Sequence, residues 1–200
     1  MSDCLVTGMP NVGKTCFVIN FAEYMGLQEL KFYMKQQAGY TSINSYSPEE
    51  AMSRLVSAND NFTKNVQSIN IEIPAGKTYR RMEIIDSCGL TDGIHHNEEI
   101  RKAMAKTLGL IRKSSFILHM IDVLNINKKG EILMPVDRMI LKYALKEKKY
   151  AILINKIDLI YASNKIEILK QQLHNTIMIP ISALYKRGFK EVKKLVLNYG

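Results

Sequence analysis

Residues 8–15 read Gly8-Met9-Pro10-Asn11-Val12-Gly13-Lys14-Thr15, a complete G-x-x-x-x-G-K-[ST] phosphate loop that directly follows a short apolar run, Cys4 to Thr7. The two glycines let the backbone curl so that several N–H groups point inward at an anion. Lys14 brings a positive charge to the β- and γ-phosphates, and the Thr15 hydroxyl can ligate Mg²⁺. The helix that begins here adds the positive end of its dipole. The pattern predicts a nucleoside triphosphate site without naming the base.

A second motif, Asn155-Lys156-Ile157-Asp158, follows the apolar run Tyr150 to Ile154, which is typical of a buried parallel strand. The Asp158 carboxylate can accept two hydrogen bonds from guanine, one from N1–H and one from the exocyclic amine. Adenine has no donor at N1 and would leave the carboxylate unpaired, which is a costly mismatch. An N-K-x-D sequence after a strand can also be an ordinary turn, since Asn and Asp favour turns. Its place after a phosphate loop favours guanine recognition over an ATP-using kinase.

Two shorter motifs complete the series. Ser182-Ala183-Leu184 follows the predicted strand Thr176 to Ile181, and a small residue there lets backbone N–H groups approach the guanine oxygen. Asp86-Ser87-Cys88-Gly89 closes the predicted strand Arg81 to Ile85. Asp86 can hold a water of the Mg²⁺ shell, and the Gly89 N–H can sense the γ-phosphate. Each motif alone is also an ordinary turn, and the order of the four along the chain gives them their meaning.

In this order the motifs resemble those of guanine-nucleotide-binding domains in the phosphate-loop GTPase superfamily, and they are most similar to its Era/TrmE-like branch, whose pattern is G-x-P-N-V-G-K-[ST]. The resemblance covers Cys4 to about Leu197. It implies a molecular switch that binds GTP and GDP with Mg²⁺ and hydrolyses GTP to GDP and phosphate. The implied nucleotide contacts are Asn11, Val12, Gly13, Lys14, Thr15, Cys16, Asn155, Lys156, Asp158, Ser182, Ala183 and Leu184. The implied catalytic groups are Lys14, Asn11, Thr63 and Gly89, and the implied Mg²⁺ ligands are Thr15, Thr63 and, through water, Asp86.

The residue after the D-x-x-G glycine bears on the mechanism. Ras-like proteins place a glutamine there to orient the attacking water, whereas this chain has Leu90, whose apolar side chain cannot do so. The branch that the chain resembles also has an apolar residue at this position. Some of its members use a monovalent cation held partly by the phosphate-loop asparagine, which corresponds to Asn11. K⁺ there would neutralise charge where an arginine finger otherwise acts. The alternative is that Asn11 only shapes the loop by a side-chain hydrogen bond to the backbone.

The switch I threonine should lie just before the second strand and ligate Mg²⁺ in the GTP state. Thr63 precedes the alternating strand Val66 to Ile73 and lies 23 residues before Asp86, which resembles the family spacing. Thr41 is the competitor, although it lies too far upstream. Either threonine can instead be a simple loop residue.

Residues 27–62 form an insert that is longer than a minimal switch I. Leu27 to Lys35 can be an extra strand or a helical extension. Ser47-Pro48-Glu49-Glu50 is a capping box with proline at the first helical position, and it predicts a helix from Pro48 to Ala58. The apolar side of that helix should consist of Met52, Leu55 and Val56. The insert is a candidate effector or self-association surface, or an elaboration that covers a sheet edge.

Strand and helix patterns alternate along the rest of the chain. They predict a single GTP-binding domain over residues 1–200, an α/β fold with a doubly wound, mostly parallel six-stranded sheet and helices on both faces. With 200 residues, 46% of them hydrophobic, the chain can bury a sizeable core. A further strand is expected at Ser115 to Ile121. Helices are expected at Thr15 to Met25, Glu98 to Arg112, Pro135 to Lys146, Ser163 to Leu173 and Gly188 to Leu197.

The net charge is +9, from 28 basic and 19 acidic residues. Such a surface can meet RNA or anionic lipid, although acidic residues among the basic runs also fit a solvated face. The sequence opens into its first strand and has no apolar stretch long enough for a membrane span, so we expect a cytoplasmic location. Three classes compete: a hydrolytic switch with an unknown protein effector, a ribosome or RNA assembly factor, and a nucleotide-binding scaffold with negligible turnover. A nucleotide-dependent homodimer is compatible with each.

Overall fold

A single mixed sheet forms the centre of the molecule. The computed structural model describes residues 2–35, 40–56, 66–93, 95–126, 132–147, 149–159 and 162–199. The strands are β1 (Ser2–Thr7), β2 (Leu30–Lys35), β3 (Thr41–Tyr46), β4 (Gln67–Ala75), β5 (Thr78–Asp86), β6 (Phe116–Asp122), β7 (Lys149–Asn155) and β8 (Met178–Pro180). The helices are α1 (Lys14–Tyr24), α2 (Pro48–Leu55), α3 (Glu98–Lys113), α4 (Pro135–Glu147), α5 (Ala162–Gln172) and α6 (Phe189–Tyr199), with a 3-10 turn η1 (Val123–Asn125). None of the helices in these ranges is long and apolar enough to cross a membrane.

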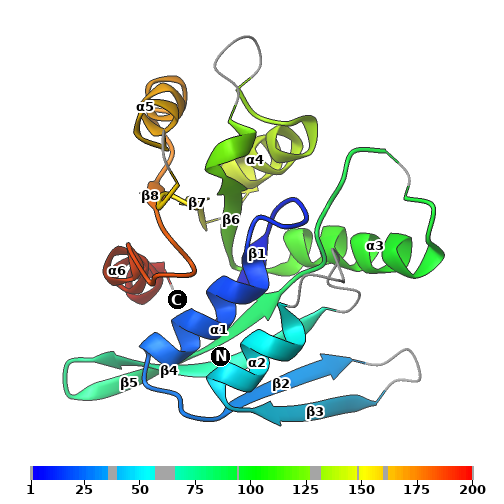
Figure 1. Ribbon diagram of the computed structural model, residues 1–200, viewed down its shortest axis with the longest axis vertical. Coiled ribbons are helices and arrows are strands. Elements are labelled where there is room, and N and C mark those ends of the chain that lie inside the picture. The colour runs from blue at the N-terminus through cyan, green and yellow to red at the C-terminus, as the bar shows by residue number, and fades with distance from the viewer. Residues whose placement is uncertain are drawn as a thin grey trace.

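The strand order is β3-β2-β4-β5-β1-β6-β7-β8 (Figure 1). β1 pairs in parallel with both β5 and β6, and the parallel ladder continues through β7 to β8. This arrangement confirms the predicted doubly wound α/β fold. Because parallel strands run in one direction, the loops that follow β1, β5, β6, β7 and β8 meet at the same edge of the sheet.

The predicted number of six strands is wrong, because β2 and β3 add an antiparallel hairpin beyond β4. Leu30 and Phe32 of β2 are buried and point to one side of the sheet, so this segment is the extra strand and not a helical extension. Its apolar alternation is too short to distinguish the two from sequence. The hairpin covers the edge that β4 would otherwise expose. This agrees with the interpretation of the insert as an elaboration that covers a sheet edge.

The capping box of the insert forms as predicted. The backbone N–H of Glu50 donates to the Ser47 hydroxyl at 3.2 Å, and the N–H of Ser47 donates to the Glu50 carboxylate at 3.0 Å. The helix ends at Leu55, earlier than expected, and residues 57–60 lie outside the described ranges. Its buried residue is Ala51, and Met52 and Leu55 pack against the core as predicted. Val56 is the C-cap and is 37% exposed, so it does not belong to the apolar side.

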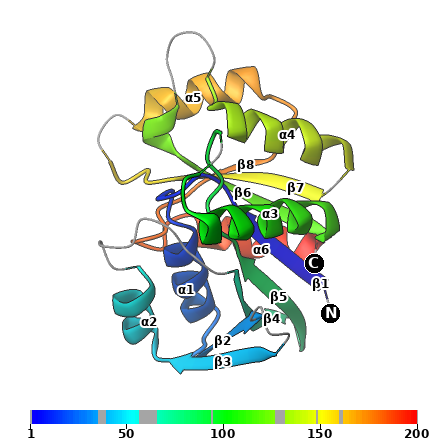
Figure 2. The same cartoon turned by 90° about the vertical axis from the view of Figure 1, so that its right-hand side faces the viewer.

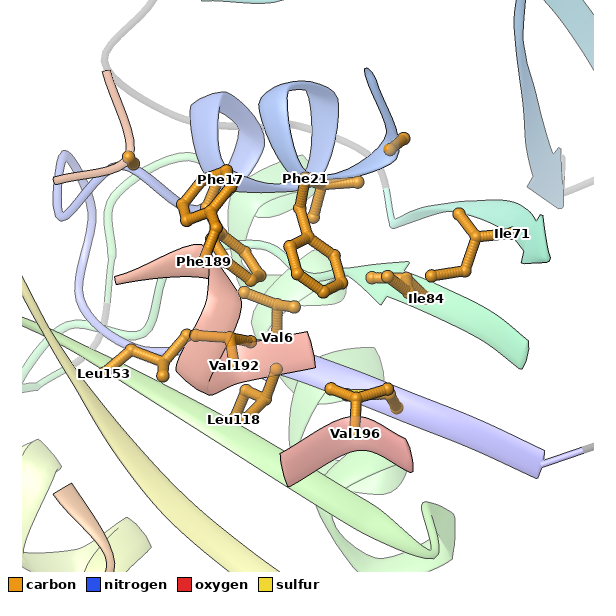
Figure 3. Close-up of a cluster of buried hydrophobic side chains, with 14 of the residues drawn as sticks. Val6, Phe17, Phe21, Ile71, Ile84, Leu118, Leu153, Phe189, Val192 and Val196 are labelled. Atoms are coloured by element: carbon orange, nitrogen blue, oxygen red, sulfur yellow. The ribbon is translucent and has the colours of Figure 1, made fainter. Parts of the chain in front are cut away.

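Helices cover both faces of the sheet. On one face the aromatic rings of Phe17 and Phe21 from α1 stack at 5.2 Å, and Phe189 from α6 packs edge-on against both at 5.5 and 5.6 Å (Figure 3). α3, α4 and α5 contribute to a second cluster on the opposite face, which contains Ile111 and Ile140. Figure 2 shows α3 in front of the sheet with α6 behind it. This double cover explains why β6 is buried along its whole length and consists mostly of apolar residues, apart from His119 and Asp122.

Candidate functional site

The loops at the carboxyl edge of the sheet bring the sequence motifs together. The Thr15 hydroxyl, at the start of α1, donates to Asp86 Oδ2 at the end of β5 over 2.7 Å. The Asn155 amide, at the end of β7, donates to the backbone carbonyl of Val12 over 2.7 Å. Two motifs separated by more than 70 residues from the phosphate loop therefore contact it directly.

The phosphate loop has the backbone shape that its glycines allow. Gly8, Asn11 and Gly13 have φ angles of 143°, 60° and 94°, in the region that L side chains rarely adopt. A Cβ atom on Gly8 would lie 2.2 Å from the Met120 carbonyl oxygen, and one on Gly13 would lie 2.4 Å from the Asn155 amide nitrogen. Both positions require glycine because neighbouring atoms fill the space of a side chain.

Lys14 is a buried cation that is held over this loop. Only 5% of it is exposed, and its amine donates to the carbonyl of Met9 at 2.8 Å and to that of Gly8 at 3.3 Å. Burial lowers the pKa of Lys14 to about 8, while the nearby Asp86 acts in the opposite direction. Among the described residues no carboxylate forms an ion pair with this amine, so its charge remains available to an anionic ligand.

Asp86 is fully buried and holds two neighbours with one oxygen. Its Oδ2 accepts from Thr15 at 2.7 Å and from the Gln67 amide at 3.0 Å, while its Oδ1 has no hydrogen-bond partner among the described residues. Burial raises the pKa of the carboxyl group, and these two hydrogen bonds oppose the shift. A buried oxygen of this kind fits a water molecule of a Mg²⁺ shell, which would donate to it.

The donor set also fits Mg²⁺ better than a transition metal. The described part of the chain contains no group of three or more His, Cys, Asp or Glu side chains that could hold a metal ion. A site built from the Thr15 hydroxyl, Asp86 through water, and phosphate oxygens would consist of oxygen ligands, which Mg²⁺ prefers.

Asn155 is a bridge between loops. Its Oδ1 accepts from the backbone N–H of Ala183 at 2.8 Å, and its amide donates to Val12, so it joins the phosphate loop to the loop after β8. Ala183 also accepts from the Asn20 amide of α1 at 2.8 Å. These two hydrogen bonds fix the orientation of the amide, which keeps a second N–H donor for a ligand. The predicted contact of Asn155 with the nucleotide stays a prediction.

Lys156 and Asp158 follow this bridge. Lys156 has a positive φ of 68°, and its amine lies 2.5 Å from Asp122 Oδ2 at the end of β6. The Asp158 carboxylate is half-buried and accepts no hydrogen bond from the residues that the structure describes. It keeps both oxygens available for two donors on one edge of a base.

The other predicted nucleotide contacts lie around the same edge. Ser182 is buried, pairs with Arg187 through two backbone hydrogen bonds of 3.2 Å, and accepts from the N–H of Tyr185 at 3.3 Å. Cys16 lies in the first turn of α1 and is 8% exposed, whereas Leu184 is 57% exposed. The contacts of Cys16 with a phosphate would have to come from its backbone.

Gly89 lies against the phosphate loop. A Cβ atom here would meet the backbone nitrogen of Pro10 at 2.7 Å, so only glycine permits this approach. Leu90 donates its N–H to the Gly8 carbonyl at 3.1 Å, while its side chain is buried in the second core cluster. The Leu90 side chain therefore points away from the site and cannot orient water.

Three predicted contacts have different outcomes. Thr63 lies outside the described residues, so its role stays a prediction. Thr41 lies on β3 next to Ser42. Across the sheet, Ser42 pairs with Met34, Met34 with Gln67 and Gln67 with Asp86, so Ser42 lies three strands, or roughly 14 Å, from Asp86. The described conformation thus disfavours Thr41 as a ligand. The exposed Asn11 side chain makes no hydrogen bond to the described residues, so its positive φ, which Asn tolerates, accounts for its place in the loop.

Sequence reasoning missed Gln67 and Asp122. Gln67 is buried at the start of β4 beside Asp86, and a lone glutamine at a strand end carries no recognisable signal. Asp122 ends the apolar run of β6, and this position at the carboxyl edge was a usable signal for a partner of Lys156.

Comparisons with solved structures agree with this geometry. An Era variant from Aquifex aeolicus bound to GDP and aluminium fluoride aligns with a TM-score of 0.67 and 20% identity over 98% of this chain. Era in complex with MgGDPNP and a segment of 16S ribosomal RNA aligns at 0.61 and 19% over 99% of this chain. The cytosolic domain of L. pneumophila FeoB aligns at 0.56 and 17% over the whole chain. At these identities the likeness establishes the fold.

The chain spans 56% of the length of each Era chain and 69% of the FeoB domain. A search of curated proteins finds no significant match. A family model does match, over residues 40–156, and its description is "50S ribosome-binding GTPase". This stretch is more than half of the chain and contains Asp86, Gly89, Asn155 and Lys156, although it begins after the phosphate loop. The chain therefore belongs to this family of GTPases and shares its fold with these Era and FeoB structures.

Proposed function

We propose that this protein binds GTP and GDP with Mg²⁺, hydrolyses GTP to GDP and phosphate, and acts as a molecular switch for a protein effector. The observation that carries the proposal is the convergence at Asp86, whose buried Oδ2 binds Thr15 while its buried Oδ1 lacks a partner among the described residues. A buried, half-satisfied carboxylate beside a phosphate loop is costly unless a ligand completes it.

Each residue then has one task. Lys14 and the backbone N–H groups of residues 11–16 hold the β- and γ-phosphates, and the Gly89 N–H contacts the γ-phosphate in the GTP state. Thr15, Thr63 and, through water, Asp86 hold Mg²⁺, which neutralises charge on the phosphates when bound. Lys156 covers the base with its aliphatic stem, and Ser182, Ala183 and Leu184 line the guanine oxygen.

Asp158 selects guanine. Its two carboxylate oxygens accept from N1–H and from the exocyclic amine, so Asp158→Asn places a donor where guanine also donates. We expect GTP to bind this variant at least about 100-fold more weakly, because the amide N–H of the variant faces a donor of guanine and neither is paired. Xanthosine triphosphate, which has a carbonyl in place of that amine, should bind the variant better than wild type. Titration of both fluorescent nucleotides measures this reversal, and tight ATP binding by wild type would contradict the base assignment.

The attacking water has no polar side chain at position 90 to orient it. We propose that Asn11 would help to hold K⁺ near the phosphates, which would supply the missing positive charge. The exposure of the Asn11 side chain beside the loop supports this role. Single-turnover hydrolysis in matched KCl and NaCl should be faster in KCl, and Asn11→Ala should abolish the difference. Turnover that is slow and equal in both salts would refute K⁺ assistance and leave the catalytic group to a partner.

A ribosome or RNA assembly role is the second candidate. The family description refers to ribosome binding, one of the similar Era structures contains 16S ribosomal RNA, and the chain carries a net charge of +9. Co-sedimentation with ribosomes that requires GTP and weakens with salt would support it. A scaffold without turnover would instead bind GTP tightly and leave it intact in a single-turnover assay. We also propose that the protein is cytoplasmic and forms a nucleotide-dependent homodimer.

A further inference from the structure

A groove lies between α3 and the strands β2, β4 and β5, away from the phosphate loop. It holds a cavity of about 530 Å³, within the range of sites that bind a side chain cluster or a small ligand. We call it the α3 groove. The lining residues that matter for its chemistry are Tyr33, Gln67, Ile85, Lys106, Gly109 and Lys113.

Gly109 keeps this groove open. It lies inside α3, where glycine costs about 1 kcal/mol relative to alanine. A Cβ atom at this position would meet nothing within 4 Å, so packing does not require glycine here. Its effect is to leave a hollow in the helix wall of the α3 groove, opposite the buried Ile85 of β5.

The rim of the α3 groove carries cations without acidic partners. Lys106 and Lys113 lie two helical turns apart on the same side of α3, and both are exposed. Lys102, one turn earlier, is paired with Glu98 at 2.7 Å, whereas no carboxylate of the described residues forms an ion pair with Lys106 or Lys113. Glu83 is the one acidic residue of the lining. An apolar floor below two unpaired lysines complements an apolar side chain flanked by acidic ones.

Gln67 connects the α3 groove to the candidate Mg²⁺ site. It lines the groove, is 4% exposed, and donates to Asp86 Oδ2 at 3.0 Å, the same oxygen that accepts from Thr15. A ligand that moves the Gln67 amide changes the hydrogen bonding of Asp86 directly. No other residue of the groove lining contacts Asp86 through a side-chain hydrogen bond that the structure describes.

We propose that the α3 groove is the docking site for an acidic, amphipathic segment of the effector protein, and that Gln67 links its occupancy to the magnesium and nucleotide site. This inference rests on the proposed switch function, because an effector must distinguish the GTP and GDP states. Linkage requires that the segment bind the two states with different affinity.

The test begins with selection of peptides from a random library on the whole chain loaded with a non-hydrolysable GTP analogue. Selected peptides should be rich in Asp, Glu and apolar residues. Their affinity, measured by fluorescence anisotropy, should fall more than tenfold in Gly109→Leu, which fills the hollow. The matched control is Ser53→Leu, which places the same side chain at an exposed position of another helix, α2, and should bind like wild type. Equal binding to both variants would overturn the assignment of the groove.

The linkage between the α3 groove and the nucleotide site is tested by the rate at which a fluorescent GDP analogue dissociates. This rate is measured with and without saturating peptide, across a range of Mg²⁺ concentrations. The peptide should change this rate several-fold in wild type, and the change should disappear in Gln67→Met while peptide binding persists. An unchanged rate in wild type would refute the linkage. If the wild type bound decanoate but no peptide, and Gly109→Leu did not bind decanoate, the groove would be assigned to a small amphiphile. That result would overturn the effector proposal.

The two levels of inference fail separately. GDP binding and GTP turnover are measured on wild type, Gly109→Leu and Ser53→Leu without peptide, and all three should be equal. Failure of the wild-type protein to bind nucleotide would refute the proposed function. Normal binding and turnover without any selected peptide would sink the docking proposal alone.

Discussion

Asn155 offers the sharpest test of how the site is held together. Its side chain is 3% exposed and satisfies two buried backbone groups, the carbonyl of Val12 and the N–H of Ala183. Asn155→Ala removes both partners at once. Each buried polar group left unpaired costs about 1–3 kcal/mol, and water entering the space recovers part of it, so we expect a loss of about 2–4 kcal/mol. This is a large share of the free energy of unfolding of a typical domain, which is roughly 5–15 kcal/mol.

The assay is urea denaturation of the nucleotide-free chain, followed by GDP titration. Asn70→Ala is the control, since Asn70 is exposed on β4 and should change the free energy of unfolding by less than about 0.5 kcal/mol. Because Asn155 joins the phosphate loop to the base loop, GDP affinity should also fall at least about tenfold, equivalent to 1.4 kcal/mol. A nucleotide-free Asn155→Ala chain as stable as the Asn70→Ala control would refute the bridge.

Three further predictions test single features. Because burial lowers the pKa of Lys14 from 10.5 to about 8, the unfolded chain binds more protons between these values, and the contribution of Lys14 to stability rises as the pH increases from 8 to 10.5. Lys14→Met should therefore stabilise the nucleotide-free chain at pH 7 by about 1–3 kcal/mol in urea while abolishing GTP binding; lower stability would contradict the pKa argument. Gly188→Ala should lower the free energy of unfolding by more than about 2 kcal/mol, since Gly188 has a φ of +77° and the new Cβ would lie 2.4 Å from a carbonyl oxygen. Gly76→Ala, with a φ of +65° and open space around it, should lower it by about 1 kcal/mol, and equal thermal shifts for the two variants would count against the clash. Ser47→Ala should lose about 1 kcal/mol from the capping box and Ser53→Ala, in mid-helix, much less, as denaturation would report.

The sequence was most informative where chemistry restricts the residue type. Gly8, Lys14, Asp86 and Asn155 each lie where strand ends meet, so four short motifs were enough to predict the edge of the sheet that carries the site. Their contacts could not be predicted, because a hydrogen bond such as that from Asn155 to Val12 depends on how distant loops pack.

Predictions failed where the local pattern was weak. The β2–β3 hairpin has only short alternation, and its two strands gain their stability from pairing with β4 and with each other. Gln67 was missed for a related reason: its partner Asp86 is known only after β4 and β5 are aligned. The end of α2 was placed too late because its apolar pattern continues through Val56, which the structure leaves exposed.

The hydrogen bond from Thr15 to Asp86 has a consequence for the orientation of lone pairs. A hydroxyl group has one proton, and Thr15 donates it to Asp86 Oδ2. The lone pairs of the Thr15 oxygen then point away from the Asp86 carboxylate. The protein thus fixes the polarity of this oxygen before any metal arrives, and the rotational freedom of the group is already lost in the free state.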